Sequence, residues 1–255
     1  AKLAFAGLSE VRRRGPAGLS GCVRGAGAGL YGLAWEWRRR AYELGWGRAQ
    51  DAGARVVSVG NLTVGGTGKT TLTLWLARRA RQRGLDPAVV CRRYRPGPAG
   101  RGDEELLYRA ALGEERVFAG RSKLELARAA AAAGLGVVLV DDGFSHWALA
   151  RQADIVLLDA HDLLGGGRLL PAGRLREPLR ALQRATAVVV SRLRAGEEAA
   201  PWLERAARLA PGALMAAGRH RVTGVRALAG GAVPAGARVE LLTATGNPAA
   251  VEASA

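Results

Sequence analysis

The sequence predicts an α/β protein in which a mostly parallel β-sheet is flanked by helices. Short apolar runs rich in β-branched residues alternate with stretches rich in Ala, Leu and Arg that have the length of helices. A glycine-rich segment follows the first apolar run, and two adjacent aspartates end the third. With 255 residues, of which 49% are hydrophobic, the chain is long enough to bury the core that such a sheet needs.

The first expected element is an amphipathic helix within residues 1–50. Its apolar residues recur at helical spacing, and three consecutive arginines from Arg38 and several tryptophans stand nearby. The apolar face consists of Leu30, Leu33, Ala34, Trp37 and Ala41. Such a helix suits the headgroup layer of a membrane, but it suits packing on the protein's own core equally well. The chain contains no run of about 18 apolar residues, so we expect no membrane-spanning helix.

Residues 51–210 are expected to form the core, which begins with a strand at residues 56–59. The next segment, residues 63–70, reads Thr-Val-Gly-Gly-Thr-Gly-Lys-Thr and leads into a helix. This is the layout of a phosphate-binding loop, although the strict pattern has Gly where Thr63 stands. Lys69 can reach the β- and γ-phosphates of ATP, and the Thr70 hydroxyl is placed for Mg²⁺. The residues expected to bind ATP are Thr63, Val64, Gly65, Gly66, Thr67, Gly68, Lys69 and Thr70.

The same alternation predicts the other core elements. Strands are expected at residues 88–91, 137–140, 155–158 and 187–190, and helices at residues 70–83, 103–112, 122–133 and 178–184. Residues 96–102 read as a loop. After about Pro211 the pattern becomes shorter and more strand-like, for example at residues 237–243. Residues 211–255 are therefore expected to begin a smaller C-terminal lobe.

Asp141 and Asp142 follow directly on the expected strand at residues 137–140. Ligands of open α/β sheets bind at the carboxyl ends of the strands, so both carboxylates are expected beside the phosphate loop. One of them can hold Mg²⁺ directly or through water, and which one does so stays open. An aspartate at a strand end can also cap a helix or form a turn, but the neighbouring phosphate loop favours metal binding.

The formal net charge of +16 indicates anionic partners. No recognition helix, zinc finger or aromatic RNA-binding motif accompanies it, so nucleic acid is not the expected partner. An anionic substrate or an anionic membrane surface accounts for the same charge. Cys22 and Cys91 form no disulfide or metal pattern, which indicates a reducing, cytoplasmic setting.

Four motifs, in this order, resemble those of the tetraacyldisaccharide 4′-kinases of lipid A synthesis. They are Val-Gly-Asn-Leu-Thr-Val-Gly-Gly-Thr-Gly-Lys-Thr from Val59, Gly-Asp-Glu from Gly102, Asp-Asp-Gly-Phe-Ser-His from Asp141, and Leu-Leu-Pro-Ala-Gly-Arg-Leu-Arg-Glu-Pro from Leu169. Gly-Asn-Pro from Gly246 resembles a later segment of the family. The variant phosphate loop with Thr63 is itself the form found in this family.

The resemblance implies a P-loop kinase that uses ATP and Mg²⁺ to phosphorylate the 4′-hydroxyl of tetraacyldisaccharide 1-phosphate, giving lipid IVA. It places the protein on the cytoplasmic face of the inner membrane of a Gram-negative bacterium, and we expect a monomer. The implied metal ligands are Thr70 with Asp141 or Asp142, and the implied catalytic residues are Asp103, Lys69, Arg121 and Arg176. Without the resemblance, Asp103 reads as a helix N-cap, and the two arginines read as surface residues.

The sequence departs from the family's pattern at Thr71, Glu105 and Ser145. It also ends before the family's Asp-His-His segment, whose His supports the catalytic Asp. We therefore expect a truncated chain that binds Mg-ATP but transfers phosphate slowly or not at all. Two other classes stay open: a P-loop ATPase or switch of the partitioning or metallochaperone type, and a non-enzymatic basic binding protein.

Overall fold

The structure, a computed structural model, describes residues 19–93 and 100–220. Seven strands in these residues form one fully parallel sheet in the order β3-β2-β4-β1-β5-β6-β7. The strands are β1 Arg55–Asn61, β2 Pro87–Arg92, β3 Val117–Gly120, β4 Val137–Asp141, β5 Ala153–Asp159, β6 Ala187–Ser191 and β7 Leu214–Ala217. The central strands are almost continuously apolar because helices cover both faces of the sheet. The expected α/β fold is confirmed.

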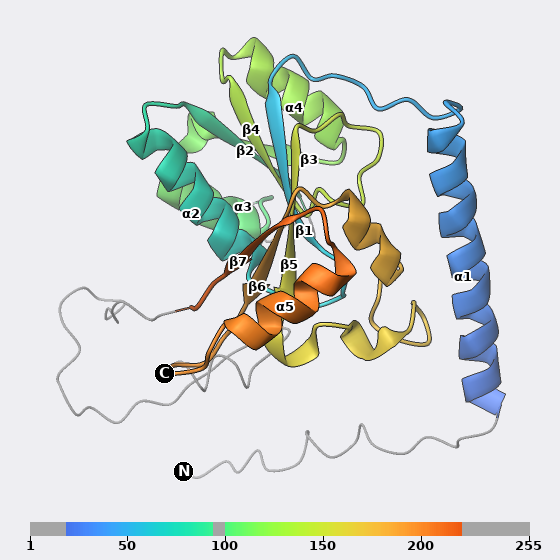
Figure 1. Ribbon diagram of the computed structural model, residues 1–255. Coiled ribbons are helices and arrows are strands. Elements are labelled where there is room, and N and C mark those ends of the chain that lie inside the picture. The colour runs from blue at the N-terminus through green and yellow to red at the C-terminus, as the bar shows by residue number, and fades with distance from the viewer. Residues whose placement is uncertain (1–18, 94–99, 221–255) are drawn as a thin grey trace, which may run out of the picture.

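Helices lie on both sides of the sheet, as Figure 1 shows. Helices α2 (Lys69–Gln82) and α3 (Asp103–Leu112) pack on one face, where Ala77 and Tyr108 contact the buried Val89 of β2. Helix α4 (Lys123–Ala132) covers the other face through Ala127 and Ala130. Helix α5 (Ala200–Leu209) and the 3₁₀ helix at Leu179–Arg184 enclose a core with β5 and β6. Three shorter 3₁₀ helices lie at Glu114–Arg116, Ala160–Asp162 and Gly165–Gly167.

The expected core elements are present with small shifts at their ends. The helix expected at residues 103–112 has the expected bounds, whereas residues 179–184 form a 3₁₀ helix. Strands β3 and β7 and helix α5 were not expected from the sequence. Because β7 pairs with β6, the core sheet continues beyond residue 211, where a second lobe was expected to begin. The strand-like residues 237–243 lie outside the described residues.

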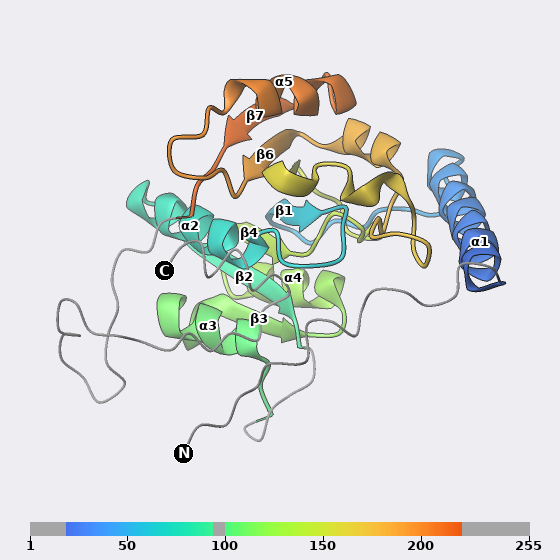
Figure 2. The ribbon, with the colours of Figure 1, turned by 90° about the horizontal axis from the view of Figure 1, so that it is seen from below.

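Helix α1 (Leu19–Glu43) stands at the side of the molecule, and both views place it far from α2 (Figures 1 and 2). It packs on the core through Trp35, whose ring meets the edge of Trp147 with 6.0 Å between centroids. The face expected from the sequence points the other way, since Leu30, Leu33 and Trp37 are 69%, 68% and 68% exposed. One face of α1 therefore packs on the protein while the expected apolar face meets solvent. Within the described residues, no helix is both long enough and apolar enough to span a membrane.

Candidate active site

A cleft of about 350 Å³ opens at the carboxyl ends of the central strands. The side chains and backbone that line it come from the loop after β1, the end of β2, the start of α3 and the end of β4. They belong to Lys69, Arg92, Gly102, Asp103, Glu104, Asp141 and Asp142. Parallel strands bring these distant segments together at one edge of the sheet, as expected for this fold class.

The phosphate loop connects β1 to α2 and ends at Gly68, which occupies the N-cap position of α2. The φ angle of Gly68 is 89°, a left-handed value that glycine adopts without strain. Helix α2 begins at Lys69, so its free N–H groups and the positive end of its dipole point toward the cleft. Lys69 Nζ donates to Asn61 Oδ1 at 3.0 Å and lies 3.8 Å from Asp142 Oδ1. Burial lowers the pKa of Lys69, and the charge of Asp142 opposes that shift.

Asp142 lies in a left-handed conformation, with a φ angle of 52°. Few non-glycine residues adopt this conformation, and aspartate is among those that do so most readily. Arg176 Nη1 donates to its Oδ2 at 2.8 Å, and Lys123 Nζ donates to its backbone carbonyl. Partial burial raises the pKa of Asp142, but the hydrogen bond and charge of Arg176 outweigh it, so the pKa lies below its ordinary value. Both carboxylate oxygens of Asp142 therefore face cations of the protein itself.

Asp141 is the last residue of β4 and is buried, unlike its neighbour. Its Oδ2 accepts a hydrogen bond from the Tyr108 hydroxyl at 2.7 Å, and Thr70 lies beside that hydroxyl. Its Oδ1 has no hydrogen-bond partner among the described residues. Burial raises the pKa of Asp141, which the hydrogen bond from Tyr108 opposes. A buried carboxylate oxygen without a partner is costly, so this atom is well suited to bind a cation.

Asp103 is the first residue of α3, and its carboxylate lines the cleft. Gly102 takes the N-cap position and no side chain caps this helix, so the interpretation of Asp103 as an N-cap is wrong. Helix α3 is anchored two residues later by Glu105. This buried carboxylate accepts hydrogen bonds from Arg93 Nε at 2.9 Å and from Arg109 Nε at 3.0 Å.

The structure brings together most of the residues expected to form the site. Arg176 reaches the loop and the cleft, because its guanidinium also donates to Asn61 Oδ1 at 2.6 Å. Arg121 is exposed on the turn before α4, two residues from the buried Lys123 that contacts Asp142. Lys123, Tyr108 and Asn61 were not expected from the sequence. Asn61 alone carried a signal, because it lies inside the first motif.

Comparisons with known proteins show the family to which the chain belongs. Residues 27–254 match the family model described as tetraacyldisaccharide-1-P 4′-kinase. A tetraacyldisaccharide 4′-kinase of Halorhodospira halophila is 44% identical over 179 residues, which cover 64% of this chain and 54% of that protein. One from Anaeromyxobacter is 41% identical over 204 residues, 73% of this chain and 54% of that protein. This chain thus spans about half the length of the curated relatives it matches.

A crystal structure supports the same assignment. LpxK from Aquifex aeolicus in complex with ATP superposes with a TM-score of 0.55 at 31% sequence identity. The superposition covers 64% of this chain and 56% of the other. This chain, with its parallel sheet and its phosphate loop beside a cleft, is thus similar to a protein whose crystal structure contains ATP.

Proposed function

This chain belongs to the tetraacyldisaccharide-1-P 4′-kinase family, and from that premise we propose that it transfers the γ-phosphoryl group of ATP to the 4′-hydroxyl of a tetraacyldisaccharide 1-phosphate. The observation that carries the proposal is a single cleft that joins Lys69 of the phosphate loop to the carboxylates of Asp103, Asp141 and Asp142. A cleft of this composition provides both a cation for the phosphates and a base for an acceptor hydroxyl.

The residues around Asp141 fit a bound Mg²⁺. The unpaired, buried Oδ1 of Asp141 and the nearby Thr70 hydroxyl are the oxygen ligands that Mg²⁺ prefers, and Asp142 is already engaged by Arg176 and Lys69. In the described residues no group of three or more His, Cys, Asp or Glu side chains could hold a metal. The protein atoms that would hold the ion are Asp141 Oδ1 and the Thr70 hydroxyl. When bound, Mg²⁺ would neutralise charge on the β- and γ-phosphates.

The protein's own residues have separate roles in the transfer. The loop amides and Lys69 bind the phosphates and offset their negative charge. Asp103, exposed at the start of α3, accepts the proton of the acceptor hydroxyl as oxygen attacks phosphorus. Arg176 holds Asp142 and the loop in place, and its guanidinium, which lies beside Asp142, would offset negative charge on the transferred group. Most of the catalytic effect therefore comes from positioning and charge, as is usual for phosphoryl transfer.

The lipid acceptor requires access to a membrane surface, and α1 supplies a suitable face. Leu30, Leu33 and Trp37 are exposed together on a helix that also carries exposed arginines at Arg38 and Arg40. An apolar face bordered by arginines is typical of a helix that lies in the headgroup layer of an anionic membrane. We place the protein peripherally on the cytoplasmic face of the inner membrane on this basis.

The test is a transfer assay with γ-labelled ATP, Mg²⁺ and the tetraacyldisaccharide 1-phosphate in detergent. Label on the lipid, accumulating slowly as the sequence leads us to expect, is the predicted result. Lys69→Ala should reduce the rate about 100-fold or more, because the variant loses the cation on the transferred group. Asp103→Asn should cost about 10²–10⁴-fold by removing the base. Asp51→Asn is the matched control, since Asp51 is an exposed aspartate away from the cleft. Lipid-independent release of phosphate without labelled lipid would instead support an ATPase or switch.

A further inference from the structure

The backbone of a phosphate loop can bind an anion only when its N–H groups point inward, which requires its carbonyls to point outward. A carbonyl that turned toward the ligand would repel phosphate oxygens. Glycine-rich segments are free to make such turns, because glycine is permissive in φ and ψ. Something outside the loop must therefore restrain its carbonyls if the loop is to be ready for the ligand.

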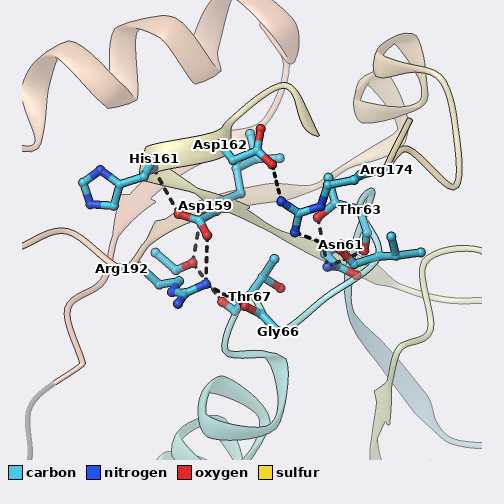
Figure 3. Close-up of polar contacts among 12 residues, drawn as sticks. Asn61, Thr63, Gly66, Thr67, Asp159, His161, Asp162, Arg174 and Arg192 are labelled. Atoms are coloured by element: carbon cyan, nitrogen blue, oxygen red, sulfur yellow. Dashed lines mark hydrogen bonds and ion pairs between the residues drawn. The ribbon is translucent and has the colours of Figure 1, made fainter. Parts of the chain in front are cut away.

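Side chains from outside the loop bind four of its carbonyls, and Figure 3 shows several of these contacts. Arg192 Nη1 donates to the Gly66 carbonyl at 2.8 Å, and Ser191 Oγ donates to the Thr67 carbonyl at 2.9 Å. Arg174 Nη2 donates to the Val64 carbonyl at 3.0 Å. The Thr63 carbonyl accepts two hydrogen bonds, from Asn61 Nδ2 at 2.9 Å and from Arg176 Nη2 at 3.2 Å.

Two of these donors are themselves held by aspartates at the carboxyl end of β5. Arg192 Nη1 lies 2.9 Å from Asp159 Oδ2, and Arg174 Nη1 lies 2.8 Å from Asp162 Oδ2. Figure 3 shows both pairs on the same side of the loop. Since Asp159 pairs with Ser191 in the sheet register, Arg192 extends from the rigid end of two adjacent strands.

The Asp159–Arg192 pair is the stronger anchor. Its side chains are 13% and 11% exposed, whereas those of Asp162 and Arg174 are 30% and 53% exposed. Exposed ion pairs contribute little, because water and salt screen them. Arg192 also has a φ angle of 68°, a strained value for a residue with a side chain. Strain of this kind persists where the surrounding structure needs the side chain in one place, and here that place is the Gly66 carbonyl.

Arg174 also packs against the loop backbone at Gly65, where the backbone conformation itself requires glycine. Gly65 has a φ angle of 119°, and a Cβ atom there would lie 2.9 Å from Arg174 Nη2. The guanidinium thus packs directly on the loop backbone. This packing fits a role in holding the loop, and a side chain at Gly65 would displace the Arg174 guanidinium.

We propose that the Asp159–Arg192 pair, assisted by Asp162–Arg174, consists of positioning residues that hold the carbonyls of the phosphate loop away from the bound phosphates. The inference rests on the proposed function, because it takes the ligand of the loop to be a nucleoside triphosphate. Neither pair needs to touch the reacting atoms. The pairs act through the loop, so their loss should weaken phosphate binding as well as stability.

The chain offers a closely matched control on the same strand. Asp154 lies near the amino end of β5, and its Oδ1 is 2.8 Å from Arg151 Nε, with side chains 12% and 11% exposed. Arg151 also donates to backbone carbonyls, those of His146 and Leu149. This ion pair therefore matches Asp159–Arg192 in strand and burial, and its arginine likewise donates to backbone carbonyls, but it lies at the opposite end of the sheet from the phosphate loop.

The experiment compares Arg192→Gln with Arg151→Gln in the full chain. We expect both substitutions to lower the melting temperature. Only Arg192→Gln should raise the dissociation constant of a fluorescent ATP analogue, by about tenfold, the effect of losing a charge-assisted hydrogen bond. The affinity of Arg192→Gln for inorganic tripolyphosphate, measured by competition with the analogue, should fall by a similar factor, because the loop binds phosphates. Arg174→Gln should have a smaller effect. If Arg192→Gln does not fold, Asp159→Asn keeps the guanidinium and should shift both constants in the same direction.

The outcomes separate this inference from the proposed function. Wild-type protein that does not bind the ATP analogue would contradict the proposed function. Wild-type protein that binds, with equal dissociation constants in the Arg192 and Arg151 variants, would overturn the positioning role alone. Weakened ATP binding with unchanged tripolyphosphate binding would also overturn it, because Arg192 would then act on the nucleoside.

Discussion

Asp141 and Asp142 are adjacent in the chain but meet different surroundings at the end of β4. Asp142 faces Arg176, Lys69 and Lys123, and its pKa is lowered despite partial burial. Asp141 is buried beside Tyr108, and its pKa is raised. We therefore propose that the Asp142 carboxylate organises the cations of the site, while Asp141 keeps an oxygen available for a metal ion. This division follows from the peptide turn at Asp142, which directs the two side chains to different partners.

Tyr108→Phe tests the role of Asp141. The substitution keeps the ring in the core but removes the hydroxyl that fixes Asp141 Oδ2. We expect the Mg²⁺ concentration needed for half-maximal ATP binding to rise about 10–100-fold, the usual effect of losing a partner that orients a metal ligand. The measurement is a Mg²⁺ titration with a fluorescent ATP analogue, with Tyr42→Phe on α1 as the control. An unchanged Mg²⁺ requirement in a folded Tyr108→Phe protein would show that Asp141 is held without the tyrosine.

Side-chain partners were the part of the site that sequence reasoning could not supply. The phosphate-loop pattern predicted Lys69, the end of a strand predicted the aspartate pair, and the family resemblance alone implied a catalytic role for Asp103. Tyr108 and Asp141 are separated by 33 residues, and nothing in their spacing indicates that one donates to the other. A contact of this kind depends on how α3 packs on the sheet, which becomes visible only in the folded chain.

At the scale of elements, α3 shows how one helix presents the proposed base and anchors itself. Asp103 faces the cleft at its first turn, and Glu105 is buried with Arg93 and Arg109. The hydrogen bond from Arg93 is the main cause that lowers the pKa of Glu105; burial opposes it and Arg109 adds to it. The position of the expected base thus depends on an ion pair that lies outside the cleft.

Glu105→Gln should destabilise the protein in a pH-dependent way. The pKa of Glu105 is lower in the folded than in the unfolded protein. The contribution of its carboxylate to the free energy of unfolding is therefore fully present above the unfolded pKa, and it is lost as the pH falls through the folded pKa. We expect the variant to lose about 1–3 kcal/mol of unfolding free energy at neutral pH. The difference from wild type should shrink below about pH 4. Urea denaturation across pH measures this, and the exposed Glu114→Gln should change stability by less than about 0.5 kcal/mol.

Helix α1 yields a prediction about its solvent-facing side. Replacing Leu30, Leu33 and Trp37 together with serine removes exposed apolar surface, so the fold should survive. Binding to anionic vesicles should fall about 100-fold or more, because each apolar side chain gains on the order of 1–2 kcal/mol on entering the membrane interface. Serine substitutions at the exposed Trp75, Leu106 and Leu107 provide the control. Equal vesicle binding by the two triple variants would argue that α1 does not contact the membrane.

At the scale of the whole molecule, the sequence predicted those strands of the sheet that are long and apolar. Strands β1, β4 and β5 were expected because parallel strands covered on both faces read as continuous apolar runs. Strand β3 was missed because it has four residues, too few for a clear pattern. Strand β7 reads Leu-Met-Ala-Ala, which carries no β-branched residue, and it is a strand because it pairs with β6. Tertiary pairing, rather than local preference, extends the sheet there.

Charge acts on the molecule as a whole, and it predicts how membrane binding responds to salt. A net charge of +16 attracts the protein to an anionic surface, with about 1 kcal/mol for each Lys or Arg near that surface. Salt shortens the Debye length from about 30 Å at 0.01 M to about 3 Å at 1 M, so this attraction should fade over that range. The apolar face of α1 is not screened in this way.

Wild-type protein should therefore bind anionic vesicles strongly at low salt and retain a weaker binding at high salt. The variant with serine at residues 30, 33 and 37 should bind at low salt only, because charge is its remaining attraction. Vesicle co-sedimentation at several salt concentrations, with neutral vesicles as the control, separates the two contributions. Wild-type binding that did not change with salt would mean that the excess of arginine has no part in membrane attachment. Identical salt curves for both proteins would instead leave charge as the whole attraction, with no contribution from α1.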